Sequence, residues 1–196
     1  MVRNPIRLKN LRARFLPLYV VGVLALIFLP PDPSRFGLAL PAIGIGTALR
    51  SWGAGHLVKN HALTTTGPYA HLRHPLYLGT LLVGSGFAWL VGGWIAFAAL
   101  AVLWPWFAFR YFPRKERSES ARLAALYGPR FERYRTAVPA LWPRLRAWRD
   151  PDESGDPVAA SGWRLERYSD NNELGTLLAI LAGVLVFALR ASRGAA

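Results

Sequence analysis

Between Arg73 and Arg110 the sequence holds 36 consecutive residues, 74 to 109, without a charged side chain. A helix of that length would extend about 54 Å, whereas the hydrocarbon core of a bilayer is about 30 Å thick and is crossed by about 20 residues. The run is therefore too long for one span and predicts two. A glycine doublet at its centre, flanked by tryptophans, suits a tight reversal at the membrane interface. We expect a helical hairpin with arms at about 75–91 and 94–111.

Three further apolar stretches are long enough, or nearly so, to cross a bilayer. They cover residues 15–30, 36–57 and 174–189. The Pro-Asp-Pro-Ser sequence between the first two has turn chemistry, and Arg50 near the end of the second is expected to extend along its helix toward the headgroups. The sequence thus predicts an all-α protein, a polytopic membrane helix bundle with about five transmembrane helices.

Composition supports this assignment and excludes two other classes of protein. Hydrophobic residues make up 53% of the chain, charged residues only 18%, and cysteine is absent. A disordered basic tail lacks apolar residues, and a small disulfide scaffold needs cysteines.

The net charge of +13 raises the question of nucleic-acid binding. Much of the basic charge lies between residues 110 and 149, beside the expected hairpin. A basic segment next to membrane spans usually meets anionic headgroups. No zinc-ligand spacing, phosphate-binding glycine loop or basic aromatic sheet motif occurs in the sequence. We therefore expect the lipid bilayer, and no nucleic acid, as partner.

The basic residues also predict the orientation of the spans, because those that flank short loops stay on the cytoplasmic side. With the basic N-terminus in the cytoplasm, Lys59, Arg73 and the basic residues after Arg110 fall on one side. Arg190 and Arg193 would fall on the other, so the last stretch could instead lie in the interface or enter without crossing. We expect an integral membrane protein, in the inner membrane if bacterial, with its site facing the cytoplasm. Since further apolar stretches follow the first, we expect no cleaved signal peptide.

All four histidines fall within 19 residues at the expected cytoplasmic mouth between the second and third spans. They are His56, His61, His71 and His74. A metal site of imidazoles alone is one interpretation, but no cysteine and no acidic residue between Asp32 and Glu116 is present to complete it. Another interpretation is that these histidines, like tyrosines, simply suit the headgroup region of the membrane. We predict no metal site.

The segment around Pro75 combines a helix start with polar and aromatic side chains. Proline suits the first turn of a helix, where the free backbone N–H groups attract a carboxylate or phosphate. Arg73 and His74 stand beside this end as donors, while Tyr69 and Tyr77 offer aromatic faces that can hold a cationic or sulfonium centre. Two glutamates that follow the hairpin on the same side supply the anions that an ammonium group would need.

Three motifs occur in a fixed order around the hairpin. They are HALTTTG at 61–67, YAHLRHPLYLG at 69–79 and, after the hairpin, ExxxLxxxYGxxFxxYxxxVP at 119–139. Together they resemble the isoprenylcysteine carboxyl methyltransferase family and its bacterial, phospholipid methyltransferase-like relatives. The resemblance covers residues 61–139.

The resemblance implies S-adenosylmethionine as cofactor, bound at the cytoplasmic ends of the spans rather than in a dinucleotide-binding fold. It implies a short helical lid at 127–139, with Tyr134 packed inward. It also implies an acceptor that is a membrane lipid or an isoprenoid-bearing molecule. By position, the cofactor pocket would be lined by His61, Ala62, Leu63, Thr64, Tyr69, His74, Pro75, Leu76, Tyr77 and Glu119.

Two positions depart from the family pattern. Family members commonly carry paired glutamates, but Ser120 follows Glu119, and Lys115 holds the position of an arginine that meets the acceptor. Lysine keeps the charge but loses the fork that binds a carboxylate. The acceptor could therefore differ from a prenylcysteine carboxylate. Arg73, Lys115 and Glu119 are the predicted catalytic residues.

Methyl transfer is an in-line displacement, so the site mainly has to place the acceptor atom about 3 Å from the methyl group. A carboxylate acceptor needs no base but a cation to orient it, for which Arg73 or Lys115 would serve. An amine acceptor would have to lose a proton to Glu116, Glu119 or His74. We favour O-methylation of a carboxylate and leave N-methylation open.

Two other functions fit parts of the pattern. A sterol-type membrane reductase has a similar hairpin but uses NADPH, and this chain is short for enclosing a sterol. A non-enzymatic membrane protein could bind lipid or haem through its histidine-rich mouth.

On the methyltransferase interpretation, the chain divides into a membrane methyltransferase domain at 1–149, a polar linker at 150–173 and a last membrane helix at 174–196.

Overall fold

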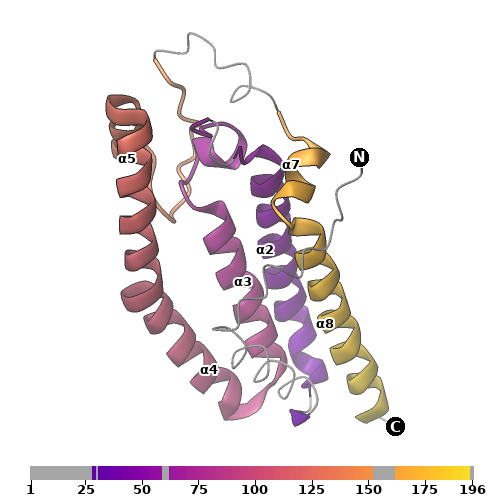
Figure 1. The fold of residues 1–196 in the computed structure, drawn as a ribbon. Helices are drawn as coiled ribbons and strands as arrows, with labels where there is room; N and C mark the ends of the chain where they lie inside the picture. Colours follow the sequence, from indigo (N-terminus) through magenta and orange to yellow (C-terminus); the bar gives the residue numbers. More distant parts are fainter. Residues whose placement is uncertain (1–27, 30, 59–61, 152–161, 195–196) are drawn as a thin grey trace.

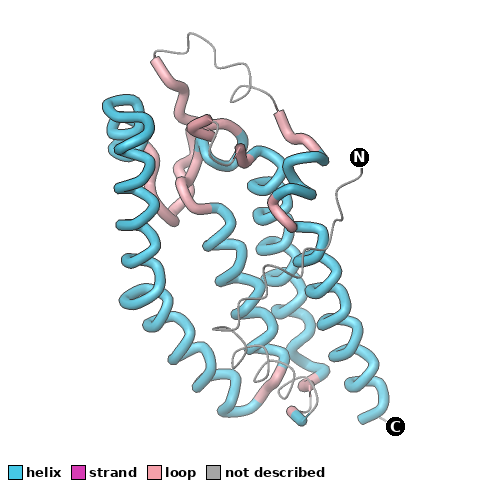
Figure 2. Tube along the Cα trace, viewed as in Figure 1, coloured by secondary structure: helices cyan, strands magenta, loops and turns pink. Residues whose placement is uncertain are grey.

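The computed structural model describes residues 28–29, 31–58, 62–151 and 162–194. Within these ranges the chain is helical and contains no β-strand (Figure 2). The expected all-α class is therefore confirmed for the described part of the chain. The apolar stretch 15–30, expected to form the first span, lies almost entirely outside the described residues.

Two closely packed helices, α2 (Phe36–His56) and α3 (Pro75–Leu90), form the centre of the fold (Figure 1). Glycines make their contact. A Cβ atom on Gly46 would lie 2.7 Å from the carbonyl oxygen of Gly79. Small residues of this kind let two helix backbones approach closely, so larger side chains at these positions would push α2 and α3 apart.

The predicted hairpin is confirmed, with its turn at the glycine doublet. α3 ends at Leu90, and α4 (Gly93–Pro105) begins directly after the turn. The φ angles of Gly92 and Gly93 are 78° and 55°, a left-handed backbone that glycine adopts without strain. The turn is fixed to the segment before α2, because the backbone N–H of Asp32 donates to the carbonyl of Leu90 over 3.0 Å.

The second arm of the hairpin continues into a charged helix. A six-residue π-helix, η5 (Trp106–Tyr111), joins α4 to α5 (Phe112–Ala137). This wider turn follows Pro105, whose ring nitrogen cannot donate a helical hydrogen bond. α5 bends at Gly128, where φ is 49° and ψ is −129°. In Figure 1 the whole arm meets α3 near the hairpin turn and diverges from it toward α5.

The C-terminal part adds α7 (Leu165–Asp170) and α8 (Glu173–Gly194). α8 runs beside α2 in Figure 1, and its residues Ile180 and Phe187 are buried in one cluster with residues of α2 and α3. α7 lies within the segment that the sequence predicted as a polar linker. These helices therefore pack against the central pair.

Arg50 corrects one expectation from the sequence. Its Nε and Nη2 atoms donate to the carboxylate oxygens of Glu173 over 2.7 and 2.8 Å. The prediction that this side chain extends to the headgroups is therefore wrong, because a carboxylate from a distant helix satisfies the guanidinium inside the protein.

Within the part of the chain that the structure describes, two helical runs are long and apolar enough to cross a membrane, judged by length and composition. They are Gly93–Ala137, which combines α4, η5 and α5, and Glu173–Ser192 in α8. Only 11% and 17% of their most apolar windows are buried inside the protein. Both helices thus present apolar surface outward, which distinguishes them from the core helix of a water-soluble domain. α3 is also apolar but shorter.

Candidate active site

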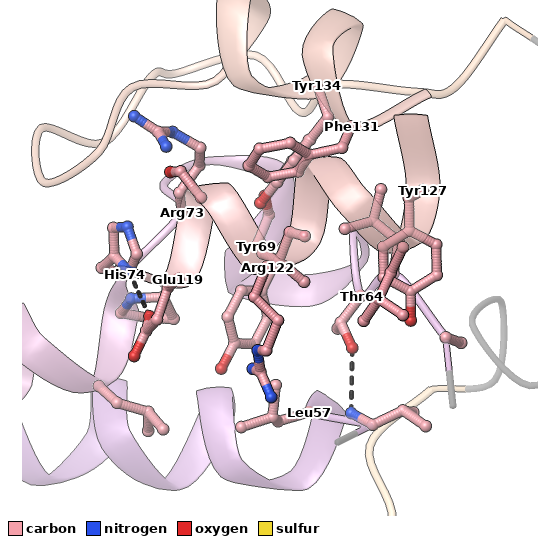
Figure 3. Close-up of a pocket in the computed structure, with 18 of the residues that line it drawn as sticks. Leu57, Thr64, Tyr69, Arg73, His74, Glu119, Arg122, Tyr127, Phe131 and Tyr134 are labelled. Atoms are coloured by element: carbon pink, nitrogen blue, oxygen red, sulfur yellow. Dashed lines mark hydrogen bonds and ion pairs between the residues drawn. The ribbon is translucent and has the colours of Figure 1, made fainter. Parts of the chain in front are cut away.

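A cavity of about 430 Å³ lies at the N-terminal end of α3 (Figure 3). Its walls come from the residues after α2, the loop that leads into α3, the first turn of α3, and α5. A volume between about 300 and 1,000 Å³ is usual for a small-molecule site. The cavity is thus large enough to hold a small organic ligand.

Backbone hydrogen bonds fix the loop that leads into α3. This loop begins with a short 3₁₀ helix, η4 (Gly67–Ala70). The N–H groups of Arg73 and His74 donate to the carbonyl oxygens of Pro139 and Ala140 over 2.9 and 3.0 Å. These bonds hold the 69–79 motif against the end of the 119–139 motif.

Glu116 binds Arg73 and His74 together beside the cavity. Its carboxylate oxygens accept hydrogen bonds from Nη1 of Arg73 and Nε2 of His74, and Nε of Arg73 donates to the carbonyl of Val138 over 3.0 Å. Burial raises the pKa of Glu116, but the hydrogen bonds and charges of His74 and Arg73 outweigh it and hold the pKa at about 2. Glu116 is therefore an ionised partner at neutral pH.

Glu119 faces the cavity itself. The Tyr77 hydroxyl donates to Oε1 of Glu119, and Oε2 lies 3.6 Å from Nδ1 of His74. The rings of His74 and Tyr77 stack with their centroids 5.3 Å apart. The Glu119 side chain is 35% exposed, so its carboxylate is oriented by protein contacts and still accessible to a ligand.

Tyr134 closes another side of the cavity. Its hydroxyl donates to the carbonyl oxygen of Tyr69 over 2.7 Å, and its ring packs in a buried cluster with Leu63, Phe131 and Val138. Burial raises the pKa of Tyr69 and of Tyr134 above the ordinary value, so both hydroxyls stay neutral. The residues after the bend at Gly128 thus form a fixed wall, and Tyr134 points inward as the sequence predicted.

The structure brings together most of the residues that the family resemblance assigned to the cofactor pocket. Those that line the cavity are Ala62, Leu63, Thr64, Tyr69, His74, Pro75, Leu76, Tyr77 and Glu119, together with Arg73. His61 lies outside the described residues. Lys115, which was expected to meet the acceptor, is not among the described residues that line the cavity.

Several residues of α5 that line the cavity were not among the pocket residues predicted from the sequence. They are Arg122, Leu123 and Leu126. These positions lie three, four and seven residues after Glu119, a spacing that places side chains on one face of a helix. Once Glu119 is assigned to the pocket, this helical spacing therefore predicts that the other three residues line it as well.

Leu57 and Val58, which follow α2, also line the cavity and were missed. The N–H of Val58 donates to the Thr64 hydroxyl over 3.0 Å. This contact joins two neighbouring parts of the wall. No local sequence signal points to it, because it depends on the course of the loop between the two residues.

The described histidines do not converge on one point. His74 lies in the cavity, Nδ1 of His71 is 2.8 Å from the carbonyl oxygen of Arg144, and His56 packs against Gly67. Within the described ranges, no three or more His, Cys, Asp or Glu side chains are placed to hold a metal ion.

The cavity combines groups of opposite charge with aromatic faces. The carboxylate of Glu119 and the rings of Tyr69 and Tyr77 suit a cationic centre. The guanidinium of Arg122 suits a carboxylate. This arrangement fits a small ligand that carries charges of both signs.

The isoprenylcysteine carboxyl methyltransferase (ICMT) family matches residues 36–124. The matched range begins at the first residue of α2 and ends within α5. It thus includes the hairpin and most of the cavity wall. The resemblance predicted from the motifs is confirmed.

Three curated relatives are similar over parts of the chain. The cobalt-zinc-cadmium resistance protein CzcN of Cupriavidus metallidurans is 36% identical over 120 residues, which are 60% of this chain and 53% of the relative. The nickel-cobalt-cadmium resistance protein NccN of Alcaligenes xylosoxydans xylosoxydans is 34% identical over 125 residues, 60% of this chain and 56% of the relative. The protein-S-isoprenylcysteine O-methyltransferase of Schizosaccharomyces pombe is 34% identical over 88 residues, 44% of this chain and 35% of the relative.

The chain therefore spans about half the length of the two resistance proteins and about a third of the yeast enzyme. No solved structure matches the chain. At the level of the family, the matches support a methyltransferase.

Proposed function

We propose that this chain, whose residues 36–124 match the isoprenylcysteine carboxyl methyltransferase family, transfers a methyl group from S-adenosylmethionine to the polar head of a membrane-embedded acceptor. The acceptor is a lipid or a prenylated molecule. The favoured reaction is O-methylation of a carboxylate. The family match supports the methyltransferase activity. The identities of the cofactor and of the acceptor are what we propose in addition.

The observation that carries the proposal is the convergence of distant motifs on one cavity. Residues 62–64, the loop and first turn around Pro75, and Glu119 on α5 meet there. Their contacts are specific, since Tyr77 and His74 orient the Glu119 carboxylate. A chance grouping of headgroup-facing side chains would not produce an oriented and accessible carboxylate beside aromatic rings.

When bound, S-adenosylmethionine supplies an electrophilic methyl group on a sulfonium, which an acceptor oxygen takes as the new O–C bond forms and the C–S bond breaks. The chain's residues have to bind and orient the reactants. Glu119 would bind the ammonium group of the cofactor. The aromatic rings of Tyr69 and Tyr77, which also line the cavity, would favour its positively charged sulfonium. Tyr134 and its buried neighbours exclude water from one wall. A carboxylate acceptor has no proton to lose, so no base is required.

Arg73 acts in this proposal as a positioning residue. Its Nη1 is held by Glu116 and its Nε by the carbonyl of Val138, so it fixes the pair of Glu116 and His74 beside the cofactor. The described lining of the cavity does not include Lys115, so we give Lys115 no role in binding the cofactor and keep its contact with the acceptor as a prediction.

We further propose a membrane arrangement of about five spans, made by the stretch 15–30, α2, α3, α4 with η5, and α8. The charged helix α5 then lies in the cytoplasm, and its part after Gly128 serves as the lid. The outward-facing apolar surfaces of α4 and α8 support this arrangement. In it the cavity opens at the cytoplasmic ends of the spans, where the head of a lipid acceptor meets the cofactor while its tail stays in the bilayer.

Two alternatives are less favoured. An NADPH-dependent reductase or a non-enzymatic lipid or haem protein would leave the family match to methyltransferases without an explanation.

The names of CzcN and NccN concern metal resistance of those proteins. Because the described residues form no metal-binding group, we do not propose metal binding by this chain.

The test is methyl transfer by the full chain in proteoliposomes, with methyl-tritiated S-adenosylmethionine. N-acetyl-S-farnesylcysteine and a bacterial lipid extract serve as acceptors. A methyl ester releases its label as methanol in base, whereas a methylated amine keeps it, so the product identifies the acceptor chemistry.

Two variants make the assay specific for the cavity. We expect Glu119→Ala to lower the rate at least about tenfold, and Glu166→Ala, a change to an exposed glutamate on α7 outside the cavity lining, to leave it unchanged. Absence of labelled product with both acceptors, or equal rates for Glu119→Ala and the wild type, would contradict the proposal.

A further inference from the structure

The segment that follows α5, residues 138–149, returns to the loop that leads into α3. This segment, which we call the return loop, forms neither helix nor strand. The N–H of Arg144 donates to the carbonyl oxygen of His71 over 3.0 Å, and the N–H of Trp148 donates to that of Ala70 over 2.9 Å. In Figure 1 the chain after α5, drawn in light orange, comes back to the level at which α3 begins. The return loop therefore has a fixed backbone beside the first turn of α3.

Two large apolar side chains of the return loop point away from the protein. Trp142 is 83% exposed and Leu145 is 97% exposed. Trp148 of the same loop instead packs on Tyr134, with the ring centroids 5.2 Å apart. Backbone hydrogen bonds hold the loop on both sides of the two exposed residues, at Ala140 and again at positions 144 and 148. Their exposure is thus a fixed feature of the surface, and it suits an environment less polar than water.

The charges of the return loop are all positive. Residues 138–149 contain three arginines and no acidic residue. Arg144 donates from Nη1 to the carbonyl of Ala137 over 2.9 Å, whereas the side chains of Arg146 and Arg149 are exposed. Tryptophan is enriched at the headgroup level of membranes, and basic side chains are attracted to anionic lipids. The exposed part of the loop therefore has the composition of a membrane interface.

The position of the return loop favours a lipid surface over a protein partner. Its hydrogen bonds end on residues 70–74, directly before α3 begins at Pro75. In the membrane arrangement proposed above, this end of α3 lies at the cytoplasmic face of the bilayer. The exposed side chains of the loop are then within reach of the headgroups.

We propose that the return loop binds the cytoplasmic leaflet, with Trp142 and Leu145 inserted at headgroup level and with Arg146 and Arg149 on anionic headgroups. This inference rests on the membrane arrangement that we propose with the function. Because the loop is hydrogen-bonded to the residues that enter α3, its lipid contact holds this end of the cavity at the headgroups. The polar head of a membrane-embedded acceptor would arrive at the same level.

The test is spin labelling of the full chain in lipid vesicles. The chain contains no cysteine, so each introduced cysteine carries a single nitroxide label. Trp142→Cys and Leu145→Cys report on the return loop. Ala125→Cys, at an exposed position of α5 outside the cavity lining, is the reference for water. Leu181→Cys, at a position of α8 that is 55% exposed, is the reference for a membrane span.

Power saturation compares how far oxygen, which enters the bilayer, and a nickel complex, which stays in water, reach each label. We expect both return-loop labels to be shielded from the nickel complex relative to the label at position 125. They should lie less deep than the label at position 181. These readouts need no methyl transfer, so their outcome is separate from that of the enzymatic assay.

The lipid charge is tested with the Leu145→Cys label in vesicles of phosphatidylcholine, with and without phosphatidylglycerol. We expect the anionic lipid to increase the shielding of this label. Arg146→Gln combined with Arg149→Gln should abolish the increase. Arg117→Gln combined with Arg164→Gln removes the same charge from exposed positions on α5 and directly before α7, and should retain it.

Three results contradict the inference in different ways. Return-loop labels that the nickel complex reaches as easily as position 125, with position 181 shielded, overturn it and would favour a protein partner at this surface. Shielding that phosphatidylglycerol does not change, or changes equally in Arg146→Gln with Arg149→Gln, overturns the recognition of anionic headgroups. A label at position 181 that the nickel complex reaches freely contradicts the membrane arrangement itself, and the inference with it.

Discussion

Arg50 and Glu173, which lie 123 residues apart, form a largely buried two-pronged ion pair between the C-terminal half of α2 and the first residue of α8. The Arg50 and Glu173 side chains are 16% and 4% exposed. Arg50 also donates from Nη1 to the carbonyl of Leu76, over 3.3 Å, in the first turn of α3. One guanidinium thus connects the C-terminal helix to a residue that lines the cavity.

Loss of the Glu173 carboxylate is expected to destabilise the fold strongly. Glu173→Ala leaves the Arg50 charge buried without its partner, which typically costs about 3–5 kcal/mol. The measurement is thermal unfolding of the detergent-solubilised protein, with Glu166→Ala, an exposed site on α7, as control. The double variant Arg50→Leu with Glu173→Leu should recover part of the loss. A Glu173→Ala protein as stable as the control would contradict this account.

Asn171 is expected to stabilise the end of α2 and, through it, the cavity wall. Its Nδ2 donates to the carbonyl oxygens of Ala54 and Leu57 over 2.9 and 3.1 Å. Asn171→Leu leaves these carbonyls without that donor, which should cost about 1–3 kcal/mol. Because Leu57 lines the cavity, affinity for S-adenosylhomocysteine should fall as well. Unchanged stability and affinity relative to a Glu166→Gln control would show that Asn171 does not hold this helix end.

The Tyr134 hydroxyl is expected to matter separately from its ring. Tyr134→Phe keeps the packing against Leu63 and Phe131 but removes the hydrogen bond to the carbonyl of Tyr69. A buried carbonyl that loses its partner costs about 1–3 kcal/mol. Thermal unfolding should show this loss for Tyr134→Phe and a larger one for Tyr134→Leu. Equal stability of Tyr134→Phe and the wild type would mean that the hydroxyl contributes nothing.

Glu116 predicts a pH dependence with a defined sign. Its pKa in the folded protein, about 2, lies below the ordinary value of 4.5. The ionised carboxylate therefore stabilises the fold fully above pH 4.5, and this stabilisation is lost as the pH falls toward 2. Thermal unfolding should shift to lower temperature on acidification from about pH 5 to pH 3, and less so in Glu116→Gln. Parallel pH profiles for the two proteins would rule out this role.

The hairpin was predictable because its signal is local. An uncharged run too long for one span and a glycine doublet at its centre are both visible in the sequence, and the structure places the turn at Gly92 and Gly93. The pocket residues were predictable for another reason. The resemblance gave their roles by position, and the cavity brings most of them together.

The contacts that the sequence did not reveal join residues far apart in the chain. The Arg50–Glu173 pair and the hydrogen bonds of Asn171 to the end of α2 depend on where α7 and α8 pack. No periodic pattern records such packing, so the segment 150–173 was predicted only as a polar linker. Lys115 does not line this cavity within the described residues, and its expected contact with the acceptor stays a prediction.

The central claim, that the cavity binds S-adenosylmethionine, is tested most directly by calorimetric titration of the purified full chain with S-adenosylhomocysteine and, separately, with NADPH. We expect saturable binding of S-adenosylhomocysteine with one site per chain, loss of that binding in Glu119→Ala, and no binding of NADPH. Saturable NADPH binding without S-adenosylhomocysteine binding would contradict the account and favour a reductase, and binding of neither would favour a non-enzymatic membrane protein.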